Sequence, residues 1–165
     1  MKYAWCNGDS RLPGPVTDMA KKKKVRVLFI CVGNACRSPM AEAVARHDAG
    51  DVIEPASVGL FPLGHIPPIT TAVLTKNGYP ADGLRSKGIT REVWESTDLF
   101  VNLSGETIEM PFPDASDLEV WDIADPFGTD VVFYERILKE LRERITALAA
   151  RLRERDNRQR NIRYS

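Results

Sequence analysis

The residue types best suited to chemistry gather in one short segment between a predicted strand and a predicted helix. Its members are Cys31, Val32, Gly33, Asn34, Ala35, Cys36, Arg37 and Ser38. Backbone N–H groups at the start of a helix have no partner within the helix, and the helix dipole adds partial positive charge there. Such a segment binds anions. We therefore predict a phosphate-binding loop, in which residues 32–38 surround the anion.

Two side chains of this loop are expected to act on the bound anion. The pKa of a free thiol is about 8.5, but helix N-termini and neighbouring cations lower it to roughly 3.5–7.5. Cys31 should therefore be a thiolate near neutral pH and serve as the nucleophile. Arg37 carries a planar guanidinium that matches two oxygens of a phosphoryl group. The alternative, an inert buried cysteine that ends a strand, leaves the Arg37-Ser38 pair unexplained.

The remaining loop residues are expected to shape and support the loop. Gly33 permits unusual backbone angles and the close approach of a ligand, and Asn34 tolerates a left-handed conformation. The Ser38 hydroxyl can donate a hydrogen bond to the Cys31 thiolate. Cys36 has two interpretations: it packs beneath the loop, or it captures an oxidised Cys31 as a disulfide and so protects the nucleophile.

Apolar, strand-like runs alternate with helical patterns along the chain. Strands are expected over residues 25–30, 52–58, 99–103 and 119–121, and helices over 38–49, 67–77, 90–95 and 134–152. Ser38 is the expected cap of its helix, with Pro39 in the first turn. This order predicts a three-layer α/β fold, a four-stranded parallel twisted sheet with helices on both faces. Ligands of such sheets bind beyond the carboxyl ends of the strands, where the phosphate-binding loop lies.

Composition limits the function classes. The 165 residues suit one domain, and 23 basic residues balance 23 acidic ones, which argues against a nucleic-acid-binding protein. No run of about 18 apolar residues indicates a membrane span. Three cysteines do not form a disulfide framework and the N-terminus lacks a signal peptide, so we expect a cytoplasmic protein. His47 and His65 lack metal-ligand spacing, and no metal site is predicted.

Three regions are expected along the chain. Residues 1–20 show no helical or strand period and are predicted to be a poorly ordered N-terminal extension. Residues 21–155 are predicted to form the single α/β domain. Residues 156–165, which are rich in arginine, are predicted to be a basic C-terminal tail.

The segment from Val27 to Ala43, VLFICVGNACRSPMAEA, resembles the signature of the low-molecular-weight protein-tyrosine phosphatases. It is also similar to that of the thioredoxin-coupled arsenate reductases, which share the fold. The resemblance extends over about residues 25–153. It implies a four-stranded parallel sheet with flanking helices, and an enzyme that needs no cofactor.

The resemblance also implies a general acid, an aspartate directly before a proline in a late loop. Asp125, followed by Pro126, is the matching position, whereas Asp122 lacks the following proline. In the implied reaction the acid protonates the leaving oxygen as Cys31 attacks phosphorus. It then activates the water that hydrolyses the phosphocysteine.

The surroundings of the loop match the family less closely. The loop after Ser57 is short, as in the reductases, and Phe127-Gly128 stand where eukaryotic-type phosphatases carry tyrosines. Phe61 and Phe127 are candidate substrate walls, with simple packing as the alternative. Ser57 matches a position that hydrogen-bonds to the loop asparagine. The predicted loop supports are therefore Asn34, Ser38 and Ser57.

The predicted function is a phosphomonoesterase, a protein-tyrosine phosphatase that acts on a phosphorylated protein or a small aryl phosphate. Inorganic phosphate or sulfate should also bind in the loop. The first alternative is an arsenate reductase. Because no cysteine follows Cys36, a relay through further cysteines of the chain is excluded, and only an external thiol or thioredoxin could supply electrons. The second, an inactive oxyanion-binding module, is opposed by the joint presence of Cys31, Arg37 and Asp125.

Overall fold

The computed structural model describes residues 23–105 and 117–163. Strands and helices alternate through these residues. The strands are β1 (Val25–Cys31), β2 (Ile53–Gly59), β3 (Leu99–Asn102) and β4 (Leu118–Val120). The helices are α1 (Arg37–Asp48), α2 (Pro68–Lys76), α3 (Arg91–Glu95) and α4 (Val131–Arg163). Each expected strand and helix is therefore present, and most of their ends lie close to the predicted ones.

The strands form one parallel sheet in the order β2-β1-β3-β4. The chain therefore steps from β1 to β2 on one side and then returns past β1 to place β3 on the other side. In open α/β sheets such a reversal leaves a crevice outside the carboxyl ends of the strands. Cys31, the last residue of β1, pairs with Gly59 at this end of the sheet.

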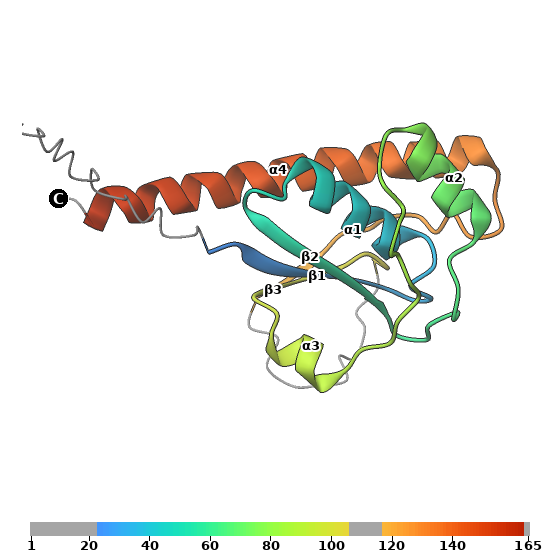
Figure 1. Ribbon diagram of the computed structural model, residues 1–165, viewed down its shortest axis with the longest axis horizontal. Helices are drawn as coiled ribbons and strands as arrows, with labels where there is room; N and C mark the ends of the chain where they lie inside the picture. Colours follow the sequence, from blue (N-terminus) through green and yellow to red (C-terminus); the bar gives the residue numbers. More distant parts are fainter. Residues whose placement is uncertain (1–22, 106–116, 164–165) are drawn as a thin grey trace, which may run out of the picture.

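Helices cover both faces of the sheet, as predicted. Figure 1 shows α1, α2 and α4 on one face and the short α3 on the other. Side chains of a strand point alternately to the two faces. Val27 and Phe29 accordingly belong to the larger hydrophobic cluster beside α1 and α4, whereas Leu28 and Ile30 pack with Trp94 of α3.

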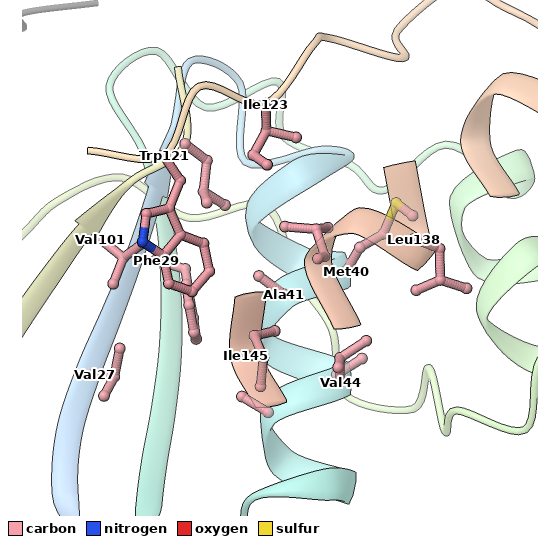
Figure 2. Packing of buried hydrophobic residues seen from close by; sticks show 14 of the residues in the cluster. Val27, Phe29, Met40, Ala41, Val44, Val101, Trp121, Ile123, Leu138 and Ile145 are labelled. Carbon is pink, nitrogen blue, oxygen red and sulfur yellow. The ribbon is translucent and has the colours of Figure 1, made fainter. Parts of the chain in front are cut away.

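The larger cluster fixes α1 between the sheet and α4. Figure 2 shows side chains of the sheet, α1 and α4 meeting in one cluster. The rings of Phe29 and Trp121 are 6.1 Å apart, and Ile145 of α4 is fully buried. Because α1 follows directly after the phosphate-binding loop, this packing also anchors one end of the loop.

The expected cap of α1 is wrong. The helix begins at Arg37, and the capping position is Cys36, whose side chain makes no cap hydrogen bond. Ser38 lies inside the first turn, and its buried hydroxyl bonds to groups of the loop and of β2. Tertiary partners have therefore replaced the local capping bond.

The predicted boundary before residue 156 is also corrected. Residues 156–163, expected as a basic tail, continue α4 without a break to Arg163. Arginine is a good helix former, and ion pairs one turn apart, Arg158 with Glu154 and Arg160 with Asp156, support this part of the helix. The extension predicted for residues 1–20 lies outside the described residues. Among the described residues no helix combines the length and the apolar character needed to cross a membrane.

Candidate active site

The phosphate-binding loop packs directly against the end of β2. A Cβ added to Gly59 would lie 2.7 Å from the backbone nitrogen of Asn34, so only glycine fits there. Asn34 has a φ of 44°, the left-handed conformation anticipated for it. Gly33 is not among the residues with a positive φ. The left-handed residue of the loop is therefore Asn34.

Arg37 is held by backbone carbonyls from two other loops. Its Nη1 donates to the carbonyl of Leu103 at 3.2 Å and to that of Ile123 at 3.1 Å. The side chain is only 6% exposed, and its Nε has no hydrogen-bond partner among the described residues. A buried N–H without an acceptor is costly. A bound oxyanion would provide that acceptor.

Asp125 reaches the same place from the loop after β4. Its Oδ2 is 2.6 Å from Arg37 Nη2, and its Oδ1 accepts a hydrogen bond from the backbone of Phe127. The Asp125 side chain is 47% exposed and therefore accessible to substrate. Asp122, the competing candidate, is exposed and does not border the cavity described next. The structure thus brings Asp125, and not Asp122, to the loop.

Cys31, Arg37 and Asp125 border one cavity of about 230 Å³. The other residues that border it are mostly small or apolar: Val32, Gly33, Ala35, Cys36, Phe61, Leu63 and Phe127. Phe61 and Phe127, the two predicted walls, are 76% and 57% exposed. Leu63 also borders the cavity and was not predicted. The buried Cys31 and Arg37 therefore lie deep in the cavity, and the exposed Phe61 and Phe127 lie at its rim.

A chain of hydrogen bonds starts at the Cys31 sulfur and runs behind the loop. Cys31 Sγ is 3.0 Å from Ser38 Oγ. Asn34 Nδ2 donates to Ser38 Oγ at 2.8 Å and to Ser57 Oγ at 3.0 Å. The Ser57 hydroxyl in turn donates to the carboxylate of Glu42. The structure thus places the three predicted supports in one chain that ends on Glu42.

Sequence reasoning missed Glu42. Its side chain is 6% exposed, and it pairs with Arg46, one helical turn away, and with Lys87 Nζ at 3.5 Å. One signal was available in the sequence. Glu42 is the single charged residue in the stretch from Pro39 to Ala45, whose other residues are apolar and buried. An acidic residue inside such a stretch needs a partner in the interior.

The segment at residues 86–88 was also missed, and it supports the loop from behind. Ser86 Oγ donates to the carbonyl of Gly33 at 3.0 Å. The backbone N–H of Lys87 donates to Asn34 Oδ1 at 2.7 Å, and the Lys87 carbonyl accepts from Gly59 at 2.8 Å. Ser86 and Lys87 each lie 53 positions along the chain from the loop residue that they contact. No local sequence pattern indicates such bonds.

Cys36 lies beneath the loop and is 3% exposed. Its Sγ is 3.1 Å from the hydroxyl of Tyr134. Burial raises the pKa of the Cys36 thiol, and the hydrogen bond with Tyr134 offsets part of that rise. Burial likewise raises the pKa of Tyr134. Cys36 thus packs beneath the loop and also borders the same cavity as Cys31, so its capture of an oxidised Cys31 stays a prediction.

Comparison with known proteins agrees with this geometry. The family model described as "Low molecular weight phosphotyrosine protein phosphatase" matches residues 26–159. A protein-arginine-phosphatase of Geobacillus stearothermophilus is 32% identical over 141 residues, covering 77% of this chain and 95% of that protein. The low molecular weight protein-tyrosine-phosphatase PtpA of Staphylococcus aureus strain Newman is 31% identical over 131 residues, covering 64% and 80%. The structure of an arsenate reductase in its phosphate-binding state has a TM-score of 0.71 at 26% identity, covering 78% and 98%. The chain therefore belongs to the low molecular weight phosphotyrosine protein phosphatase family.

Proposed function

We propose that this protein is a phosphomonoesterase, a protein-tyrosine phosphatase that also accepts small aryl phosphates, and that it acts through a phosphocysteine. The observation that carries the proposal is that Asp125, from the loop after β4, borders one cavity together with Cys31 and Arg37 of the phosphate-binding loop. Membership of the phosphatase family supports the same reaction class. A reducing compartment such as the cytoplasm suits this chemistry because it keeps Cys31 a thiol.

The proposed reaction has two steps. In the first, the Cys31 thiolate attacks phosphorus and the bond to the leaving oxygen breaks, while Asp125 gives that oxygen its proton. Arg37 and the loop N–H groups stabilise the charge on the remaining phosphoryl oxygens. In the second, the Asp125 carboxylate takes a proton from water as the water attacks phosphorus. Inorganic phosphate leaves, and the Cys31 thiolate is restored.

The ion pair between Asp125 and Arg37 must open before the first step. Asp125 Oδ2 lies 2.6 Å from Arg37 Nη2, where it competes with an oxygen of the substrate. A phosphate that binds Arg37 through both Nε and Nη2 would displace the carboxylate. Because the Asp125 side chain is half-exposed, the displaced carboxylate can then take a proton from solvent and turn toward the leaving group.

The rim of the cavity favours an aromatic leaving group. Phe61, Leu63 and Phe127 provide apolar and aromatic surface next to the site of attack, and aromatic rings pack well against such surface. A phosphoarginine would bring a guanidinium to the rim. Among the described residues that border the cavity, the only carboxylate is Asp125, which already faces Arg37.

A second candidate is arsenate reduction with an external thiol. It is favoured by the likeness to an arsenate reductase that binds phosphate, because arsenate has the same shape and charge as phosphate. Cys31 would form a sulfur–arsenic bond as one arsenate oxygen leaves as water. Two electrons from thioredoxin or a small thiol would then reduce arsenic(V) to arsenic(III), which leaves as arsenite. No cysteine after Cys36 is present to pass them within the chain.

Parallel assays separate these activities. We expect hydrolysis of para-nitrophenyl phosphate and of a phosphotyrosine peptide, and its loss in Cys31→Ser, which should still bind phosphate. Arsenate with thioredoxin or glutathione, and a phosphoarginine peptide, are the comparison substrates. Arsenate turnover or phosphoarginine hydrolysis without hydrolysis of either aryl ester would contradict the proposal. Phosphate binding without any turnover would show an inactive oxyanion-binding module.

A further inference from the structure

Glu42 places a negative charge in the interior directly behind the catalytic loop. Its side chain is 6% exposed. One carboxylate oxygen faces Arg46 and the other accepts from the Ser57 hydroxyl, with Lys87 Nζ 3.5 Å away. A buried carboxylate is stable only when cations and hydrogen-bond donors surround it. Glu42 pairs with two cations as a carboxylate, and a carboxylate can only accept hydrogen bonds.

This ionised carboxylate sets the direction of the first half of the hydrogen-bond chain. A hydroxyl can donate only one hydrogen bond, and Ser57 donates it to the Glu42 carboxylate. The Ser57 oxygen is then left to accept from Asn34 Nδ2, at 3.0 Å. A neutral group at position 42 could donate instead, and the Ser57 proton would then turn toward Asn34 and oppose the existing bond.

The second half of the chain ends on the nucleophile. The backbone N–H of Lys87 donates to Asn34 Oδ1 at 2.7 Å, so the amide presents its nitrogen to the two serines. Asn34 Nδ2 donates to Ser38 Oγ at 2.8 Å. The Ser38 oxygen is thereby occupied as an acceptor, and its proton is available to Cys31 Sγ at 3.0 Å, with the Val58 carbonyl as a weaker competitor at 3.3 Å.

Lys87 contacts this hydrogen-bond chain at two points. Its ammonium pairs with Glu42, and its backbone N–H holds the Asn34 amide. Its carbonyl accepts from Gly59, the residue on which the loop packs, so its position relative to β2 is fixed. Arg46 differs, because it lies one turn from Glu42 on the same helix and makes a pair that α1 alone can form.

We propose that Lys87 is a positioning residue for Cys31: its ammonium pairs with the Glu42 carboxylate, and this carboxylate directs the hydrogen-bond chain so that Ser38 donates to the nucleophilic sulfur. Lys87 does not border the cavity. The inference rests on the nucleophilic role proposed for Cys31. It adds that the reactivity of this sulfur depends on a charge outside the cavity, on the segment between α2 and α3.

The test compares Lys87→Met and Lys87→Arg with Lys76→Met in the full chain. Lys76 is a matched control because its ammonium also pairs with a glutamate, Glu135, at 2.6 Å, away from the loop. The first readout is the kcat and KM for para-nitrophenyl phosphate. The second is the pH midpoint at which iodoacetamide alkylates Cys31, followed by mass spectrometry of the Cys31 peptide. This readout needs no turnover, so it still tests Lys87 if the proposed phosphatase activity fails.

We expect Lys87→Met to lower kcat about five- to tenfold, as for loss of a hydrogen-bonded charge, with KM changed less than about twofold. The alkylation midpoint of Cys31 should move to higher pH, because the hydrogen-bond chain no longer directs the Ser38 proton toward the sulfur. Lys87→Arg should restore both values, and Lys76→Met should leave both unchanged. In a Glu42→Gln background, Lys87→Met should cause little further loss.

Two results would overturn the proposal. One is a Lys87→Met variant whose kcat and alkylation midpoint both equal those of the wild type. The other is equal loss in Lys87→Met and Lys87→Arg, which would assign the effect to packing and not to charge. If Glu42→Gln does not fold, the comparison of Lys87→Met with Lys87→Arg is sufficient to test the proposal. Thermal unfolding then checks that both of these variants are folded.

Discussion

Arg37 and Asp125 provide hydrogen-bond partners for each other at the site. The guanidinium uses Nη1 on two backbone carbonyls and Nη2 on the Asp125 carboxylate, while Nε is left without an acceptor among the described residues. The carboxylate thus lies where one oxygen of a bound phosphate would be. The acid role proposed for Asp125 and its contact with Arg37 place opposite demands on the same side chain.

The variant Asp125→Asn should show the two effects separately, as a change in hydrolysis rate and a change in phosphate binding. The rate of hydrolysis for substrates with poor leaving groups should fall about 10²- to 10³-fold, because the proton donor is lost. Inhibition by inorganic phosphate should become stronger, since the amide competes less for Arg37 and does not repel the anion. Steady-state kinetics with a series of aryl phosphates, and with phosphate as inhibitor, measures both effects. The exposed Asp122→Asn is the control, and an equal fall in that variant would move the acid role elsewhere.

Cys36 supports a prediction about oxidation and its pH dependence. Because burial raises its pKa, Cys36 is a thiol near neutral pH, and its thiolate fraction grows as the pH rises above the ordinary thiol range of about 8.5. Capture of an oxidised Cys31 as a disulfide needs that thiolate. After peroxide treatment, recovery of activity by dithiothreitol should therefore be more complete at higher pH in the wild type. Recovery in Cys36→Ser should be poor at every pH, and recovery equal to the wild type would refute the protective role.

At the scale of elements, the ends of β1 and β3 away from the site are joined by a charge pair. Asp98, just before β3, accepts hydrogen bonds from the backbone N–H, the Nε and the Nη2 of Arg26 in β1. These bonds lower the pKa of Asp98 to about 2. The pair joins two neighbouring strands at the amino-terminal edge of the sheet, opposite the catalytic loop.

Asp98→Asn should therefore lower stability without lowering activity. A carboxyl whose pKa is lower in the folded than in the unfolded state stabilises the fold above its ordinary pKa of about 4. The variant should lose about 1 kcal/mol at pH 7, allowing for partial exposure of the pair to solvent. The difference from the wild type should narrow as the pH falls from about 4 toward 2. Urea unfolding across this range measures it, and a constant difference would contradict the pKa shift.

At the scale of the whole molecule, α4 and the sheet enclose α1, which carries the loop. Ile145 of α4 is fully buried in the cluster that Figure 2 shows. Ile145→Ala should lower the free energy of unfolding by about 2–5 kcal/mol, through lost burial and the cavity that remains. Its neighbour Thr146 is exposed, and Thr146→Ala should change stability by less than about 0.5 kcal/mol. Denaturant unfolding compares the two, and similar values would show that this face of α4 does not hold the core.

Most of the fold could be predicted because each strand is a short apolar run and each helix has its own period. The end of α4 was missed because residues 156–163 carry no apolar stripe, and their helix depends on propensity and on ion pairs one turn apart. The cap of α1 was missed for the opposite reason. Ser38 has the right residue type for a cap, but buried partners in the loop and β2 engage its hydroxyl.

The sequence alone was enough to predict the chemistry of residues 31–38. The proposed nucleophile, the anion-binding backbone and the guanidinium all lie in one short strand-to-helix segment, so the prediction needs no distant partner. Only the tertiary structure decided which residues from other segments contact this loop. It places Asp125, 88 residues from Arg37 along the chain, against the Arg37 guanidinium, and leaves Asp122 away from the cavity. It also brought Glu42 and Lys87 to the back of the loop, where they form an ion pair. Parallel strands place the ends of distant segments side by side, and no local pattern records which side chains then come within hydrogen-bond distance.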